Sequence, residues 1–206
     1  MDPAQQKQIC QDLDLLSTAV QDALELFIAK AQPIHFDEFG NPPRLIHPCD
    51  VYNLQGGWEG WFQVELVCLL HETVMKATAG HGGMVTVARE QRVYGDGEKT
   101  DILIILTDSK DQSVKRHMSI ELKCQSKGNK DGIRTEIAKD INKVWGFGIA
   151  EQYRPCRALN IFANVEGDVN SSLKFDDGIT AKFDKIAELE DGSTTMSFFA
   201  SYLDFY

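Results

Sequence analysis

Two stretches near the middle of the chain, DILIIL at residues 101–106 and SIELKCQ at residues 119–125, decide the fold. The first has the leucine and β-branched content of a strand buried on both faces. In the second, side chains alternate between the two faces of a strand, so Glu121, Lys123 and Gln125 share one face. Burying an unpaired charge costs several kcal/mol, so these groups and Asp101 need partners, and a Mg²⁺ ion would neutralise the two carboxylates.

Around these strands, the hydrophobic periodicity predicts an α/β protein in which helices flank a sheet. The expected helices cover residues 58–77 and 132–145, and the expected strands cover residues 85–94, 101–106, 118–125 and 157–165. The tail is ambiguous: Phe183, Ile186 and Leu189 have helical spacing, whereas residues 194–203 have the pattern of a strand. The tryptophans at positions 58, 61 and 145 are expected in the core.

The N-terminal segment predicts an amphipathic helix that ends before Pro33, followed by a connector over residues 33–57. Its narrow apolar stripe fits either a helix packed on the core or the seam of a homodimer. We therefore divide the chain into an N-terminal helix and connector, residues 1–57, and a main domain, residues 58–206. Together they are expected to form one globular unit, as the length of 206 residues allows.

The charge distribution argues against indiscriminate binding of nucleic acid but leaves room for a local contact. The net charge is −10, and residues 1–60 and 165–206 each carry three basic and nine acidic side chains. Residues 61–164 carry 15 basic and 13 acidic side chains, so the middle of the chain can still face a polyanion. The five cysteines are scattered without metal-site spacing, and no signal peptide or membrane span is evident, which predicts a cytoplasmic or nuclear location.

Asp101, followed twenty residues later by Glu121-x-Lys123, resembles the motif of the PD-(D/E)XK nuclease superfamily, which has the restriction-endonuclease-like fold. The expected order of helix, three strands, helix and strand between residues 58 and 165 is the order of that fold's core. The resemblance implies an αβββαβ core, a mixed central sheet flanked by helices, and an N-terminal helical extension. Thr100 stands in place of the proline that names the motif, at a position that varies widely.

The resemblance also implies a hydrolase: a Mg²⁺- or Mn²⁺-dependent endonuclease that cleaves phosphodiester bonds, most readily in DNA. Asp101 and Glu121 would hold the metal with the Leu122 carbonyl. Lys123 would orient the attacking water or help to deprotonate it, and Gln125 would steady the site.

Many members of the superfamily add an acidic residue from the preceding helix as a further metal ligand. Glu65, which is flanked by apolar residues at helical spacing, is the first candidate, and Glu59 is the second. The cations of the second helix and of the loop before it would hold the phosphate backbone; they are Lys127, Lys130, Arg134 and Lys139.

Structural explanations for the same residues stay open. Glu121 and Lys123 can form an ordinary ion pair, Glu65 can be an ordinary helix glutamate, and the cations can form a solvated helix face. At the level of function, the alternative to a nuclease is a catalytically inactive protein on the same scaffold, whose acidic ends bind another protein.

Overall fold

A computed structural model describes residues 2–31, 58–80, 83–126, 128–129, 132–164, 172–174, 180–191 and 194–206. The expected connector at 33–57 lies outside the described residues, as do Lys127 and Lys130. The helices are α1 (Pro3–Ala31), α3 (Glu59–Thr78), α4 (Ile133–Phe147) and the short 3-10 helix η1 (Glu151–Tyr153). The strands are β1 (Met84–Arg92), β2 (Lys99–Thr107), β3 (Lys115–Cys124), β4 (Cys156–Asn164), β5 (Ser172–Lys174), β6 (Thr180–Lys182), β7 (Asp184–Asp191) and β8 (Thr194–Phe205).

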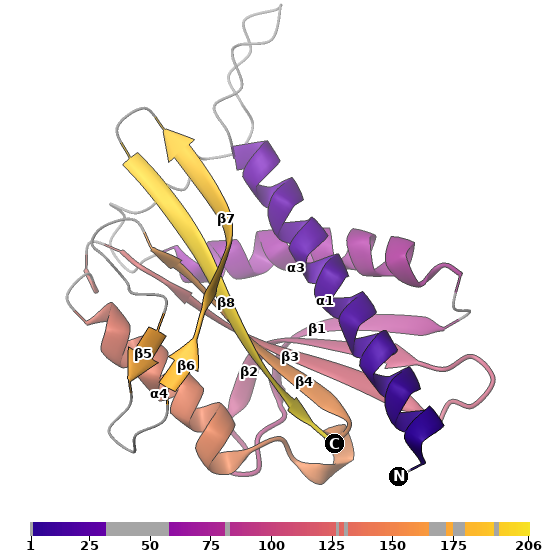
Figure 1. Ribbon diagram of the computed structural model, residues 1–206. Helices are drawn as coiled ribbons and strands as arrows, with labels where there is room; N and C mark the ends of the chain where they lie inside the picture. Colours follow the sequence, from indigo (N-terminus) through magenta and orange to yellow (C-terminus); the bar gives the residue numbers. More distant parts are fainter. Residues whose placement is uncertain are drawn as a thin grey trace, which may run out of the picture.

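The centre of the molecule is a six-stranded mixed sheet with the order β1-β2-β3-β4-β8-β7 (Figure 1). β1, β2 and β3 form an antiparallel meander, and β3 and β4 are parallel because α4 connects them. β8 and β7 then extend the sheet beyond β4 as antiparallel strands, and β5 and β6 form a separate small ribbon. The expected order of helix, three strands, helix and strand is therefore present from α3 to β4.

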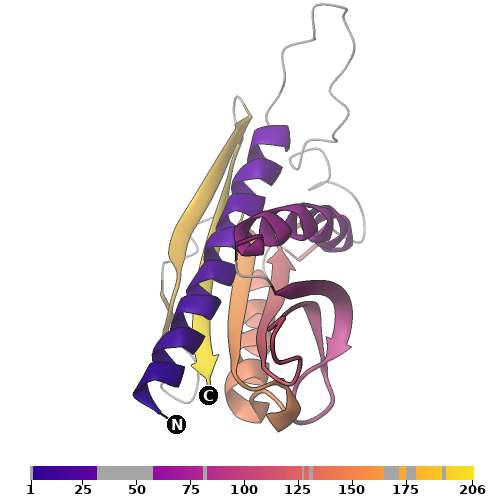
Figure 2. The ribbon, with the colours of Figure 1, turned by 90° about the vertical axis from the view of Figure 1, so that its right-hand side faces the viewer.

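The helices form layers on the two faces of the sheet. α1 crosses α3 and runs beside β7, whereas α4 lies on the side of the sheet where Phe162 and Phe183 are buried (Figures 1 and 2). A sheet with helices on both faces buries its central strands almost completely, and each of the nine residues of β4 is buried.

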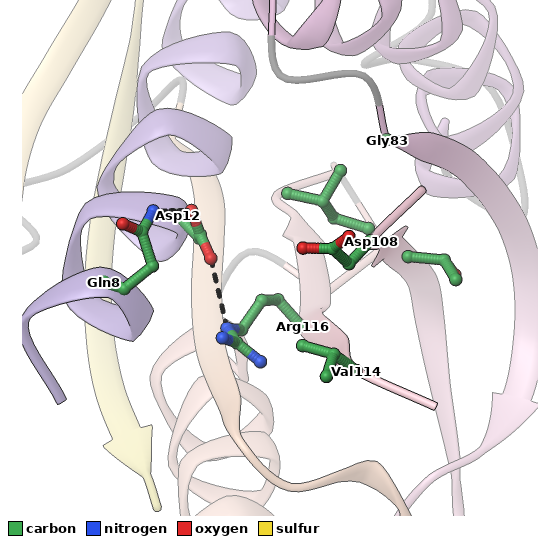
Figure 3. Close-up of a pocket in the computed structure, with 8 residues that line it drawn as sticks. Gln8, Asp12, Gly83, Asp108, Val114 and Arg116 are labelled. Carbon is green, nitrogen blue, oxygen red and sulfur yellow. Dashed lines mark hydrogen bonds and ion pairs between the residues drawn. The ribbon is translucent and has the colours of Figure 1, made fainter. Parts of the chain in front are cut away.

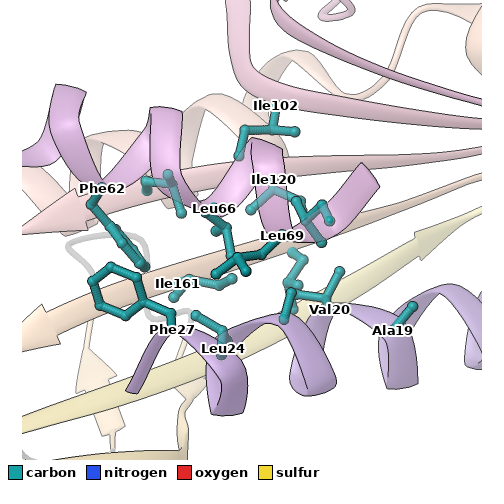
Figure 4. Close-up of a cluster of buried hydrophobic side chains, with 14 of the residues drawn as sticks. Ala19, Val20, Leu24, Phe27, Phe62, Leu66, Leu69, Ile102, Ile120 and Ile161 are labelled. Atoms are coloured by element: carbon teal, nitrogen blue, oxygen red, sulfur yellow. The ribbon is translucent and has the colours of Figure 1, made fainter. Parts of the chain in front are cut away.

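The apolar stripe of α1 belongs to the core of this chain. Val20, Leu24 and Phe27 are at most 2% exposed. They pack between the sheet and α3, where Phe27 contacts Phe62 with ring centroids 4.8 Å apart (Figure 4). Of the two explanations for the stripe, the structure therefore favours the helix packed on the core.

Two expectations about local structure need correction. The segment with helical spacing near residue 186 is strand β7, in which a register shift between Lys185 and Ala187 breaks the alternation that identifies a strand. Trp145 is 46% exposed on α4, whereas Trp58 is buried as expected. Of the helices in the described part of the chain, none has both the length and the apolar character needed to cross a bilayer.

Candidate active site

The strands β2 and β3 part at the end that carries the predicted site. The two strands are paired from Thr107 opposite Lys115 to Ile102 opposite Ile120. Beyond that point, side chains bond to the neighbouring backbone: the Thr100 hydroxyl donates to the Ile120 carbonyl at 2.9 Å, and the Leu122 N–H donates to Asp101 Oδ2 at 2.7 Å. The threonine at the proline position of the motif thus helps to hold the two strands where they separate.

Six charged side chains gather on the side of β3 that faces α4, and we call them the charged cluster. They come from α3, β2, β3 and α4, and are Glu59, Asp101, Glu121, Lys123, Asp140 and Lys143. The opposite side of β3 contributes Ile120, Leu122 and Cys124 to the hydrophobic core. The alternation read from the sequence therefore separates a charged face from an apolar one, as predicted.

Glu121 is the most deeply buried carboxylate of the charged cluster, with 4% of its surface exposed. Tyr94 Oη donates to Glu121 Oε1 at 2.5 Å, and Lys143 Nζ donates to Glu121 Oε2 at 2.9 Å. Burial raises the pKa of Glu121 to about 7, even though Lys143 lowers it, and the charge of Asp101 adds to the rise. Near neutral pH this group therefore exchanges between its protonated and ionised forms.

Lys123 pairs with carboxylates from both helices that flank the site. Its Nζ lies 3.3 Å from Glu59 Oε1 and 3.5 Å from Asp140 Oδ2, so the expected structural alternative of an ion pair between Lys123 and Glu121 is not formed. Burial disfavours the ammonium, but the charges of Asp140 and Glu59 raise the pKa of Lys123 above its ordinary value. Lys123 is protonated at neutral pH in this arrangement, so it can stabilise negative charge but cannot accept a proton.

The helix acid in the charged cluster is Glu59 and not Glu65, the first candidate from the sequence. Glu59 begins α3, where Trp58 Nε1 donates to the Gln125 carbonyl at 2.8 Å and holds the start of the helix against the end of β3. The Cys124 N–H donates to Glu59 Oε2 at 3.0 Å, and burial raises the pKa of the Glu59 carboxyl. Glu65 lies almost two turns further along and, among the described residues, makes no hydrogen bond or ion pair with the cluster.

A contact between α3 and β2 sets the position of Asp101. Gln63 Nε2 donates to the Asp101 carbonyl at 2.7 Å, and Arg89 donates to Gln63 Oε1. Burial raises the pKa of the Asp101 carboxyl, the Leu122 N–H lowers it, and the charges of Lys123 and Lys143 lower it further. Asp101 is therefore a carboxylate in a poorly solvated position; the Leu122 N–H orients its side chain, and the Gln63 side chain holds its main-chain carbonyl.

Sequence reasoning missed three groups at the site: Tyr94, Asp140 and Lys143. Asp140 and Lys143 are three residues apart on α4 and so share one face. That face lies next to the buried Ile141 and Val144, and charged residues beside the apolar stripe of an amphipathic helix were the signal available. Tyr94 follows β1 by two residues. Only the pairing of β1 with β2, and of β2 with β3, brings its hydroxyl to Glu121.

The remaining predicted residues in the described part of the chain lie after β3 and on α4. Gln125 is buried directly after β3. Arg134 and Lys139 are exposed on α4, and Lys139 pairs with Glu136 of the same helix at 2.7 Å.

The four carboxylates of the charged cluster have the right chemistry for Mg²⁺ or Mn²⁺, which prefer hard oxygen ligands. Within the described ranges, however, no three carboxylate, histidine or cysteine side chains stand close enough together to hold one ion. Lys123 and Lys143 lie where they neutralise Glu59 and Glu121 instead. The carboxylates therefore have the donor type that suits a divalent cation, but three of them would have to move closer together than they lie here to hold one ion.

Taken together, the chain is an α/β protein with a charged cluster at the parting of two central strands. No known protein family matches the chain, and neither the curated proteins nor the solved structures contain a match to it. The function must therefore be argued from the site.

Proposed function

We propose that this protein is a metal-dependent nuclease of the PD-(D/E)XK type, and that α3 to β4 form the core of a restriction-endonuclease-like fold. The observation that carries the proposal is the convergence of Asp101, Glu121 and Lys123 at the point where β2 and β3 separate. If the motif matched only by chance, a glutamate of α3 would not be expected beside the lysine. Glu59 Oε1 nevertheless accepts a hydrogen bond from Lys123 Nζ.

Each group of the charged cluster has a role in this proposal. Asp101 and Glu121 would hold Mg²⁺ or Mn²⁺, and Glu59 would hold it or orient its surroundings. The bound metal would supply Lewis-acid stabilisation of the charge that develops on the phosphate. Lys123, protonated and already fixed by two carboxylates, would orient the attacking water through a hydrogen bond and stabilise the same developing charge.

The substrate proposed is nucleic acid, and DNA in particular. Arg134 and Lys139 are exposed on α4, the helix that covers the charged cluster, and would contact phosphates on either side of the scissile bond. Because the net charge of the whole protein is −10, binding must rely on such local cations and not on the overall field.

The direct test is a cleavage assay on supercoiled plasmid, linear duplex, single-stranded DNA and RNA, with Mg²⁺, Mn²⁺ or EDTA. Wild type should cleave DNA with metal and not with EDTA, and Lys123→Ala should abolish cleavage. Lys110→Ala removes an exposed lysine from the loop before β3 and is the matched control, which should cleave like wild type. Equal cleavage by wild type and Lys123→Ala would contradict the assignment.

One observation favours a second candidate function, a non-catalytic protein that binds a partner through its acidic ends. Lys123 and Lys143 already neutralise carboxylates of the cluster, as they would in a purely structural network. The two candidates differ in metal binding, since a structural network has no affinity for Mn²⁺. Calorimetric titration of the folded protein with Mn²⁺ separates them: the nuclease requires saturable binding that is lost in Asp101→Asn, and the structural network does not.

A further inference from the structure

A pocket lies at the opposite end of β3 from the charged cluster. It has a volume of about 300 Å³ and lies between the first turns of α1, the start of β3, and the segment from η1 to β4. Lys115 in this pocket and Lys123 in the charged cluster are eight residues apart on one strand, or about 26 Å at roughly 3.3 Å per residue. The pocket is therefore a separate site.

The pocket is lined by cations and by neutral polar groups. Lys115, Arg116 and Arg154 supply three positive charges, and no carboxylate is among the lining residues in the described part of the chain. One of the charges is partly neutralised, because Arg116 Nε lies 3.2 Å from Asp12 Oδ2 of α1. Figure 3 shows this ion pair in the neighbouring pocket, which Val114 and Arg116 also line. The other two charges remain, which leaves a positive pocket on a protein whose net charge is −10.

Two of these side chains are held in place by the fold. Arg154 Nε donates to the Ile149 carbonyl at 3.0 Å, which directs the guanidinium without using its terminal nitrogens in that bond. Arg116 is only 13% exposed and is anchored by Asp12. A binding site built from oriented donors loses less conformational entropy on binding than one made of free surface lysines.

A buried histidine forms part of the wall of the pocket. His117 lines the pocket, is 3% exposed and packs edge-on against Tyr153, with ring centroids 5.5 Å apart. Its Nδ1 is buried, and among the described residues it meets no hydrogen-bond partner. Because this nitrogen has almost no exposed surface, His117 supplies a wall of the pocket and not a donor for a ligand in it.

We propose that this pocket binds a phosphate group, with Lys115, Arg116 and Arg154 as its charged donors. Phosphate has the negative charge that the cations require and enough oxygen acceptors for several donors at once. The side chains of Gln5 and Gln152 line the same pocket and can complete the contacts. This site is independent of the nuclease proposal, because it shares no residue with the charged cluster.

The test is calorimetric titration with inorganic phosphate and with pyrophosphate, in EDTA so that no metal at the charged cluster contributes. Wild type should bind at least one of the two saturably, with a dissociation constant of about 1 mM or tighter. The double variant Lys115→Gln/Arg154→Gln should weaken binding about tenfold or more, since each charge-assisted hydrogen bond contributes more than 1 kcal/mol. Lys30→Gln/Lys76→Gln removes two exposed lysines outside the pocket, changes the net charge equally, and should bind like wild type.

A second measurement keeps the test independent of variant folding. Nitrogen-detected NMR of the histidine rings in wild type should show a shift of the His117 ring signals on saturation with phosphate, because this ring lines the pocket. The proposal is overturned if neither probe binds, if the control pair weakens binding as much as the pocket pair, or if the His117 signals do not move.

Two further probes show whether the pocket takes the phosphate of a nucleic acid or that of a small compound. They are a single-stranded oligonucleotide with a 5′-phosphate and the same oligonucleotide without it. Tighter binding of the phosphorylated strand, lost in the pocket variant, supports the site and identifies a terminal nucleic-acid phosphate. Equal binding of the two strands, with pyrophosphate still bound, supports the site and identifies a small phosphate compound.

Discussion

The raised pKa of Glu121 predicts how the stability of the metal-free protein depends on pH. Its pKa is about 7 in the folded protein and 4.5 in the unfolded chain, so the folded state holds the proton more tightly. The stability contributed by this group is therefore fully present below pH 4.5 and is lost as the pH rises through 7. Between pH 5 and pH 8 the loss from this single group is about 2.5 kcal/mol, or roughly 5–10 °C in Tm for a chain of this size.

The substitution Glu121→Gln removes the titrating group and keeps the shape of the side chain. Losing the ion pair with Lys143 adds a cost of its own to the variant, so the test compares how the two curves change with pH and not their absolute values. The carboxyls of Glu59, Asp101 and Asp140, whose pKa values are also raised by burial, are present in both proteins and cancel to first order. The difference in unfolding free energy between Glu121→Gln and wild type should thus rise by about 2.5 kcal/mol from pH 5 to pH 8.

Urea unfolding in EDTA at pH 5, 6, 7 and 8 measures this difference. Glu65→Gln, which changes a glutamate outside the charged cluster, is the control and should follow the wild-type curve. Parallel curves for wild type and Glu121→Gln would refute the argument, because they would mean that Glu121 is solvated in the folded protein. Repeating the series with saturating Mn²⁺ should flatten the wild-type curve, since a bound cation favours the ionised carboxylate.

Four further predictions test the site and the fold. Asp101→Asn keeps an acceptor for the Leu122 N–H but removes a poorly solvated charge, so thermal melts in EDTA should show a more stable protein, by on the order of 1 kcal/mol. Mn²⁺ at ten times its dissociation constant should add about 1.4 kcal/mol to wild type and much less to this variant. Lys123→Ala should lose cleavage yet bind Mn²⁺ as tightly as wild type or tighter in a calorimetric titration, because a cation beside the metal is gone; weaker binding would contradict this. Glu59→Gln should lower both Mn²⁺ affinity and cleavage, whereas Glu65→Gln should change neither, and the opposite ranking would restore the choice made from the sequence. Gly83→Ala should lower the unfolding free energy by about 1–3 kcal/mol in urea, since the new Cβ would lie 2.9 Å from a backbone carbonyl oxygen of β2; an unchanged value would show that this loop can shift.

The order of the central elements was readable from the sequence because it depends on local periodicity. The apolar run of β2 and the alternation of β3 identify their strands without reference to the rest of the chain. The same alternation predicts that Glu121 and Lys123 share a face, which the charged cluster confirms. Where a bulge interrupts the alternation, as between Lys185 and Ala187, periodicity fails and the strand resembles a helix.

The partners of each charged residue were decided only by the tertiary structure. Glu59 replaces Glu65 as the helix acid because the position of α3 depends on contacts with distant strands, such as the bond from Trp58 to Gln125. Lys143 of α4, which lies 22 residues after Glu121 in the chain, donates a hydrogen bond to it. Local sequence therefore determined which residues face the site, whereas the pairing of charges required the packing of α3 and α4 on the sheet, because distances between remote segments leave no periodic trace in the chain.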